Sequence, residues 1–149
     1  MRVLVQRVSE ASVKINGAVK GEIKGGFLIL LGIEKEDTKV DADWLIKKVE
    51  SLRIFNDEDG KMNLSLEDVK GSVLVISQFT LHASTKKGNR PSYLKAARPE
   101  QAIPLYNYFL QQLESDGFQV QSGEFGADMK VSLINDGPVT IWIDSKMKE

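Results

Sequence analysis

Hydrophobic and polar residues alternate along most of the chain in the pattern of β-strands, and two longer stretches follow helical spacing. Strand-like runs occupy residues 1–8, 12–15, 18–23, 27–33, 73–81, 130–134 and 139–144. The run Phe27–Ile33 is apolar throughout, which predicts a central strand covered on both faces. The pair Asn16-Gly17, between two of the runs, predicts a tight hairpin turn.

Two helices are expected between these strands. The first runs from Asp37 or Thr38 to about Leu52, and the second from about Pro99 to Asp116. Pro104 conflicts with a regular helix, so the second helix is either kinked there or regular only from about Gln101. Because helices and strands do not alternate regularly, we expect a single α+β domain over residues 1–149. Its sheet should be curved, antiparallel or mixed, and barrel-like, with two main helices.

Composition narrows the chemistry. The chain has 149 residues, no cysteine and one histidine, His82, which excludes disulfides and thiolate sites and argues against a histidine metal centre. The acidic stretch Asn56–Lys61 could hold a metal ion, but such a cluster is more often a solvated turn. No metal or other cofactor is therefore expected. The formal net charge is −1, so a nucleic acid would have to bind a local basic patch.

The expected compartment follows from what the sequence lacks. No apolar run approaches the roughly 18 residues of a membrane span. The first residues read as a strand and not as a signal peptide. We therefore expect a cytoplasmic protein with no membrane partner.

The stretch Asn135-Asp136-Gly137-Pro138-Val139-Thr140 is the most unusual part of the sequence. It lies between the last two strand-like runs, and its Asp-Gly pair predicts a hairpin turn. Pro138 follows at once and has no N–H for the ladder of a second strand. Two interpretations stay open: an ordinary turn, or a rigid Gly–Pro peptide that presents main-chain groups to a ligand.

A second anomaly is Ser77-Gln78-Phe79-Thr80, where a buried strand turns polar. The segment is either a strand that emerges into solvent or a site. As a site it offers Thr80 as a nucleophile, with His82 as a possible base. Side chains two residues apart on a strand lie about 6–7 Å apart, beyond hydrogen-bond reach. No acid is clearly placed to orient His82, so this dyad is geometrically weak.

The third candidate is a basic segment without an acidic residue. Its cations are Lys86, Lys87, Arg90, Lys95 and Arg98. Tyr93 lies among them and could stack on a base. The combination suits a phosphate backbone, and the alternative is a solvated, mobile loop.

Taken together, these motifs resemble the D-aminoacyl-tRNA deacylases over essentially the full chain. The matching segments, in order, are Gly60–Asn63, Ser77–Leu81, Arg90–Tyr93, Gly123–Met129 and Asn135–Thr140. The resemblance implies a homodimeric enzyme that hydrolyses the ester between a D-amino acid, or glycine, and the 3′-terminal adenosine of tRNA. It also implies rejection of L-aminoacyl-tRNA. The partners expected are a second subunit and the acceptor end of D-aminoacyl-tRNA or Gly-tRNA, and not DNA.

Residue roles are carried over from the same resemblance. It implies a cis Gly137–Pro138 peptide that reaches across the dimer into the partner's pocket, and a substrate 2′-hydroxyl that activates water. Thr80 would then act more through its backbone than its hydroxyl. The catalytic candidates are Ser77, Gln78, Phe79 and Thr80; the substrate-binding candidates are Gly137, Pro138, Met129 and Asn135; the tRNA-binding candidates are Lys86, Lys87, Arg90 and Lys95.

Two functions of other classes also remain open. One is a non-catalytic RNA-binding module that uses the basic segment. The other is a small dimeric scaffold without a ligand.

Overall fold

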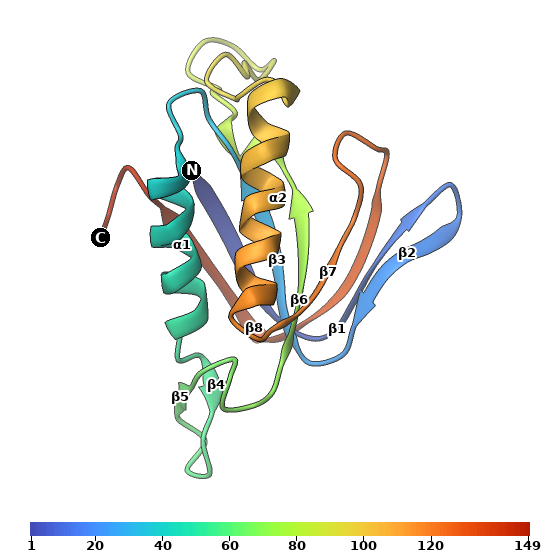
Figure 1. The fold of residues 1–149 in the computed structure, drawn as a ribbon, viewed down its shortest axis with the longest axis vertical. Helices are drawn as coiled ribbons and strands as arrows, with labels where there is room; N and C mark the ends of the chain where they lie inside the picture. The colour runs from blue at the N-terminus through green and yellow to red at the C-terminus, as the bar shows by residue number, and fades with distance from the viewer.

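A computed structural model describes all of residues 1–149 and shows a strongly curved sheet with two helices packed against one face (Figure 1). The strands are β1 (Arg2–Ile15), β2 (Ala18–Ile23), β3 (Gly26–Gly32), β4 (Phe55–Asn56), β5 (Met62–Leu64), β6 (Ser72–Ser77), β7 (Gln119–Ser122) and β8 (Lys130–Asp144). The helices are α1 (Lys39–Ser51) and α2 (Pro99–Ser115), with a 3₁₀ turn η1 (Phe79–His82). Neither α1 nor α2 combines the length and apolarity that crossing a membrane takes.

Strand β1 organises the sheet. It pairs antiparallel with β8 along one edge, and its other edge is shared between β3, opposite residues 2–8, and β2, opposite residues 11–15. Strand β3 pairs in parallel with β6, and β6 pairs in parallel with β7. The ends of the sheet come close together, because a Cβ added to Gly21 of β2 would lie 2.9 Å from the carbonyl oxygen of Ser122 in β7. The mixed, barrel-like sheet and the α+β class are thus confirmed.

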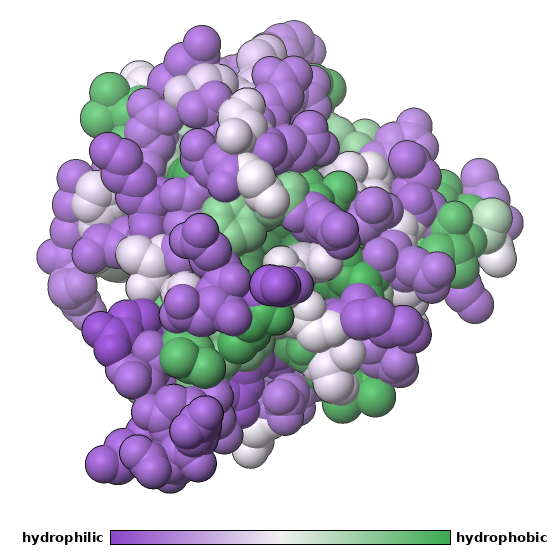
Figure 2. Space-filling view, turned by 60° about the horizontal axis from the view of Figure 1, so that its bottom comes forward, coloured by the Kyte–Doolittle hydropathy of each residue, from purple (hydrophilic) through white to green (hydrophobic).

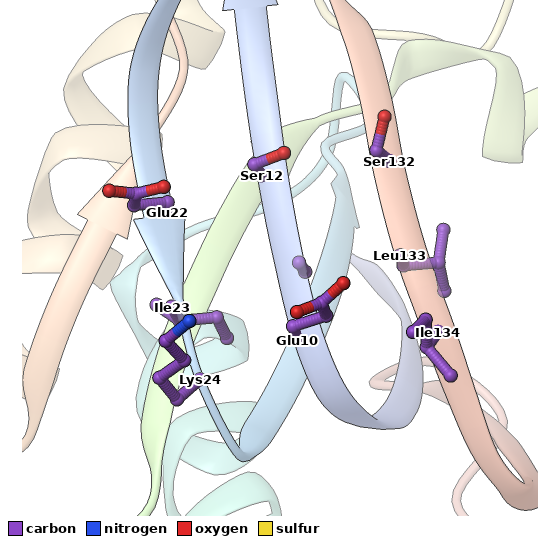
Figure 3. A pocket seen from close by; sticks show the side chains of 9 residues that line it. Glu10, Ser12, Glu22, Ile23, Lys24, Ser132, Leu133 and Ile134 are labelled. Atoms are coloured by element: carbon purple, nitrogen blue, oxygen red, sulfur yellow. The ribbon is translucent and has the colours of Figure 1, made fainter.

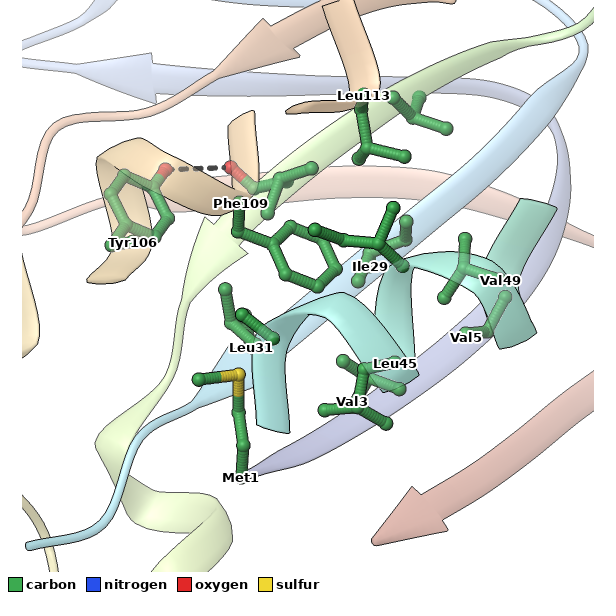
Figure 4. Packing of buried hydrophobic residues seen from close by; sticks show 14 of the residues in the cluster. Met1, Val3, Val5, Ile29, Leu31, Leu45, Val49, Tyr106, Phe109 and Leu113 are labelled. Carbon is green, nitrogen blue, oxygen red and sulfur yellow. Dashed lines mark hydrogen bonds between the residues drawn. The ribbon is translucent and has the colours of Figure 1, made fainter. Parts of the chain in front are cut away.

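The core has two parts. The larger lies between the helices and the sheet, where side chains of α1 and α2 meet those of β1, β3 and β6 (Figure 4). Phe27, Leu45 and Phe109 are fully buried there, and burying each such side chain stabilises the fold by about 1.5–3 kcal/mol. The smaller part lies inside the curled sheet and is formed by side chains of β1, β2, β3 and β6. Together they make the sheet a rigid support for the loops at its ends.

Capping and turn residues in the sequence predicted the starts of both helices and the first hairpin correctly. Thr38 caps α1: its hydroxyl accepts from Val40 N, while Asp41 accepts from the Thr38 N–H. The Asn16-Gly17 turn has positive φ at both residues, as a hairpin of this type requires. Helix α2 is helical from Pro99 and continues through Pro104, so a regular part beginning only at Gln101 is wrong.

Two predictions at the strands are wrong. Residues 130–134 and 139–144 are not arms of a hairpin but two halves of one strand, β8, because both pair with β1. Residues 78–81 do not continue β6, because the chain leaves the sheet after Ser77 and forms η1. Both departures fall on segments that the sequence had marked as anomalous.

Candidate active site

The main chain of the turn after β6 is held at both ends by residues of neighbouring strands. Gln78 N donates to the carbonyl of Leu31 at 2.8 Å, the last ladder bond of the strand. Arg2 Nη1 donates to the carbonyl of Leu81 at 2.9 Å. The N–H groups of Phe79 and Thr80, at the start of η1, donate to no group of the protein, as expected for the first turn of a helix. Two adjacent donors are thus left free to bind an anionic oxygen.

The side chains of the turn point in different directions. Gln78 Nε2 donates to the hydroxyl of Thr80. The ring of Phe79 is 53% exposed and meets Tyr93 edge to face, with centroids 4.9 Å apart. Gln78 and Thr80 therefore brace each other, and Phe79 carries a large apolar surface outward.

His82 lies on the buried side of the same turn and does not reach Thr80. Its side chain is 2% exposed, and neither ring nitrogen has a hydrogen-bond partner. The nearest acidic atom is Oε2 of Glu34, 3.9 Å from Nδ1. Burial lowers the pKa of His82 from its ordinary value. The structure therefore gives no support to a Thr80–His82 dyad, and His82 is a packing residue beneath the turn.

A pocket of about 280 Å³ opens beside the turn. Ser77, Gln78 and Phe79 form one wall, and the loop up to Met129 forms another. The sulfur of Met129 lies directly over Gly123 and leaves no space there for a side chain. The remaining lining residues are mostly apolar: Leu31, Ile33, Ile76, Ala97, Ala102, Phe125, Gly126, Ala127, Asp128 and Val131. The pocket thus has mostly apolar walls, and its polar lining residues are Ser77, Gln78 and Asp128.

A larger depression of about 430 Å³ lies on the outer face of β1, β2 and β8 (Figure 3). Ser12 there pairs with Glu22 on one side and Ser132 on the other, and Glu10 projects from the same face. Its two carboxylates outnumber its one cation, Lys24, which disfavours a phosphate backbone, and none of the candidate site residues lines this surface. The smaller pocket at η1 is the better candidate for the active site.

The unusual segment of β8 forms a bulge. Asn135 pairs with Val8 of β1, and Thr140 pairs with Gln6. Four residues of β8 therefore lie between these pairs, where β1 has one. Three residues of β8 are therefore extra, and they lie opposite Arg7. The Gly137–Pro138 peptide is cis, Gly137 has a φ of +127°, and both residues are exposed. The bulge carries the Gly–Pro peptide away from the sheet.

Arg7 supports this bulge from beneath, and sequence reasoning missed it. Its side chain is 6% exposed. Its Nε donates to the carbonyl of Asp136 at 3.0 Å and its Nη1 to the carbonyl of Ile54 at 2.7 Å. A Cβ on Gly137 would lie 2.9 Å from its Nη2. The sequence contained a signal for this role. Alternate residues of a strand share one face, so Val3 and Val5 predict an inward-facing apolar residue at position 7, and an arginine occurs there.

The four basic candidates lie in an exposed loop next to the pocket. None of these four side chains forms an ion pair within the chain: Lys86, Lys87, Arg90 and Lys95. The base of the loop is tied by two bonds between Ser84 and Ser92, at 2.8 and 2.9 Å. Tyr93 then connects it to Phe79. An uncompensated positive surface thus adjoins the turn.

Comparison with known proteins identifies the family. The model of the family described as D-Tyr-tRNA(Tyr) deacylase matches residues 4–144. The chain belongs to the D-Tyr-tRNA(Tyr) deacylase family. Proteins named D-aminoacyl-tRNA deacylase from Phocaeicola vulgatus and Akkermansia muciniphila are 64% and 62% identical to it, each over 100% of both chains. A solved structure titled c-Myc DNA Unwinding Element Binding Protein is 41% identical, with a TM-score of 0.92 over 97% of this chain and 98% of the other.

Within a single chain of this deacylase-family fold, the bulge and the pocket do not meet. The bulge lies opposite Arg7, which pairs with Phe27 near the start of β3. Ser77 pairs with Leu31 near the end of β3. Four residues of strand span about 13 Å, and the strands between add about 5 Å each. The fold thus brings Ser77, Gln78, Phe79 and Met129 to one pocket, with Thr80 in the adjoining turn, and leaves Gly137 and Pro138 elsewhere.

Proposed function

We propose that this enzyme hydrolyses the ester bond of D-aminoacyl-tRNA, and of glycine mischarged on tRNA, to release the free amino acid and tRNA. The observation that carries the proposal is a pocket flanked by the free N–H groups of Phe79 and Thr80 in a chain of the deacylase family. Its volume of about 280 Å³ is at the small end for ligand sites. That size suits the terminal nucleoside if the amino acid side chain stays outside the pocket, and the enzyme would meet this substrate in the cytoplasm.

The proposed active unit is a homodimer in which each bulge enters the partner's pocket. Two observations support this arrangement. The bulge is distant from the pocket of its own protomer, and β8 has no strand partner along its outer edge. A free strand edge of 15 residues is normally covered in a folded protein, and a two-fold axis would bring both bulges to both pockets at once.

In this arrangement Gly137 and Pro138 select the configuration of the amino acid. Both residues offer exposed main-chain carbonyls without a long side chain, and such oxygens accept well from an ammonium group. A D-amino acid held by its amine and its ester would point its side chain out of the pocket, whereas an L side chain would collide with the clamp. Discrimination by collision tolerates many D side chains and lets glycine through.

Catalysis then requires little acid–base machinery from the protein. The aminoacyl ester is already activated, and the N–H groups of Phe79 and Thr80 are placed to stabilise the oxyanion. The substrate's 2′-hydroxyl would activate the attacking water. Thr80 would contribute through its backbone, and its hydroxyl accepts a hydrogen bond from Gln78.

One assay tests the function against its rivals. Release of D-tyrosine from D-Tyr-tRNA, beside L-tyrosine from L-Tyr-tRNA, should be selective for the D substrate. Binding without release would indicate an RNA-binding module, and the absence of both would indicate a scaffold. Either result would overturn the proposal.

The mechanism has its own test. We expect Thr80→Ala to keep most of the activity and a substrate ending in 2′-deoxyadenosine to be poor. A rate loss of about 10⁴-fold in Thr80→Ala, or a trapped acyl-enzyme, would show instead that Thr80 is the nucleophile.

The basic loop is proposed to bind the tRNA backbone through Lys86, Lys87, Arg90 and Lys95. If it does, affinity for tRNA should fall steeply with salt, and replacing one lysine should reduce the slope by about one unit. Duplex DNA belongs in the same experiment as a competitor, because a solved relative is titled as a DNA-element binding protein. Equal competition by DNA would contradict a specific RNA partner.

A further inference from the structure

The two sides of the β8 bulge are joined by one side chain, that of Asn135. Its Oδ1 accepts from the main-chain N–H of Val139 at 3.0 Å, and its Nδ2 donates to the hydroxyl of Thr140 at 2.9 Å. Gln6 Nε2, from β1, reaches the same hydroxyl at 3.4 Å. Since an N–H can only donate, the bond to Val139 fixes which end of the amide faces which partner. Asn135 thus closes the neck of the bulge.

The bulge needs such a closure because it has left the ladder. Three extra residues in β8 have no counterpart in β1, so the N–H of Val139 has lost its usual acceptor. An amide side chain can accept and donate at the same time. Here it accepts from Val139, four residues along the chain, and donates to Thr140, five residues along. Arg7 holds the bulge from the buried side at Asp136, whereas Asn135 holds it from the exposed side.

Both polar atoms of Asn135 are engaged in these contacts within the bulge, whereas Gly137 and Pro138 are exposed. We propose that Asn135 and Thr140 are positioning residues that set D over L selectivity by fixing where the Gly137 and Pro138 carbonyls stand. This inference rests on the proposed function, and it replaces direct substrate binding by Asn135 with an indirect role. Steric exclusion of an L side chain is selective only if the excluding Gly137–Pro138 peptide is held in a fixed position.

The first test compares selectivity, measured as the ratio of kcat/KM for D-Tyr-tRNA to that for L-Tyr-tRNA. Asn135→Leu removes both bonds at similar size and should lower the ratio roughly tenfold or more, and Thr140→Val removes one bond and should lower it about threefold. Thr140→Ser restores the hydroxyl and should restore the ratio. Ser132→Ala, an exposed β8 hydroxyl without a hydrogen bond, is the matched control and should change nothing. KM should stay within about twofold, because the tRNA contacts are elsewhere.

A merely structural role would lower the amount of active enzyme and reduce both rates together, leaving the ratio unchanged. A second readout is independent of activity: amide hydrogen exchange at Val139 should accelerate in Asn135→Leu and stay slow in Thr140→Val.

The outcomes separate the two proposals. A selective wild type with an unchanged ratio in both Asn135→Leu and Thr140→Val overturns the inference alone. A wild type that does not prefer the D substrate overturns the proposed function and the inference with it. If Asn135→Leu does not fold, the Thr140→Val and Thr140→Ser pair decides.

Discussion

The turn after β6 and the bulge in β8 interrupt the same sheet in opposite ways. The turn ends a buried strand, lies against an apolar pocket and is held by one main-chain bond to Leu31 and by the side chain of Arg2. The bulge projects from an exposed strand and is held by the side chains of Arg7 and Asn135. Each presents main-chain groups and not a reactive side chain. At such a site, chemistry depends on the residues that hold the backbone in place.

A substitution at Gly137 in the bulge is expected to have the largest effect on activity. Its φ of +127° disfavours any side chain, and a Cβ would lie 2.9 Å from both Arg7 Nη2 and Val139 Cγ2. We expect Gly137→Ala to lower kcat/KM for D-Tyr-tRNA by about 100-fold or more. Gly60→Ala is the control, because Gly60 also has positive φ but no atom within 4 Å of a new Cβ. Similar activity losses in the two variants would show that only backbone strain matters.

Removing the support beneath the bulge should have the next largest effect. Arg7→Met keeps the aliphatic stem but leaves the carbonyls of Ile54 and Asp136 without their donor. We expect the free energy of unfolding to fall by about 2–4 kcal/mol and activity to fall at least tenfold in the protein that remains folded. Urea denaturation and single-turnover assays measure the two effects. Arg53→Met, at an exposed arginine, should cost less than about 1 kcal/mol; an equal cost at both sites would contradict a special role for Arg7.

The sequence predicted the parts of the fold that depend on local signals. Thr38 marked the start of α1, Asn16-Gly17 marked the first hairpin, and the apolar run of β3 marked the centre of the sheet. These features depend on neighbouring residues, so a single stretch of sequence contains the information.

The two site segments were marked as unusual, but their shapes were not predicted. An Asp-Gly-Pro sequence suits a hairpin as well as a bulge, and what decides is the pairing of β1 with β8 on both sides of it. Likewise η1 forms because Leu31 and Arg2, both distant in sequence, bind its ends. The residue roles came from the resemblance to a family, and Arg7 was missed because its partners are all long-range.

A pH experiment sharpens the description of the turn. His82 is packed beneath it and faces Arg2, Glu34, the carbonyl of Gly32 and the N-terminal amine. Burial lowers the pKa of His82 in the native state, so the unfolded chain binds a proton more readily. Its contribution to stability is therefore present above the unfolded pKa of about 6.5 and is lost as pH falls below it, by at most about 1.4 kcal/mol per pH unit.

His82→Leu measures this contribution. Denaturation at pH 7.5 and pH 5 should show a smaller loss of stability in the variant than in the wild type. Other shifted groups, such as Glu50, whose pKa burial and Asp116 raise to about 7, are common to both proteins and cancel in the difference. Equal losses in the two proteins would show that the pKa of His82 is the same in the native and unfolded states, which would contradict this account.

The smallest expected effect concerns Tyr93, which connects the basic loop to the turn. Its ring meets Phe79 edge to face at 4.9 Å, a contact of about 0.5–1.5 kcal/mol. Tyr93→Leu should therefore lower kcat/KM for D-Tyr-tRNA by about threefold to tenfold, whereas Tyr93→Phe keeps the ring and should be neutral. A loss in Tyr93→Phe as well would assign the effect to the hydroxyl. If the aromatic contact is what matters, the turn needs a side chain to hold it on its exposed side, just as the bulge needs Asn135.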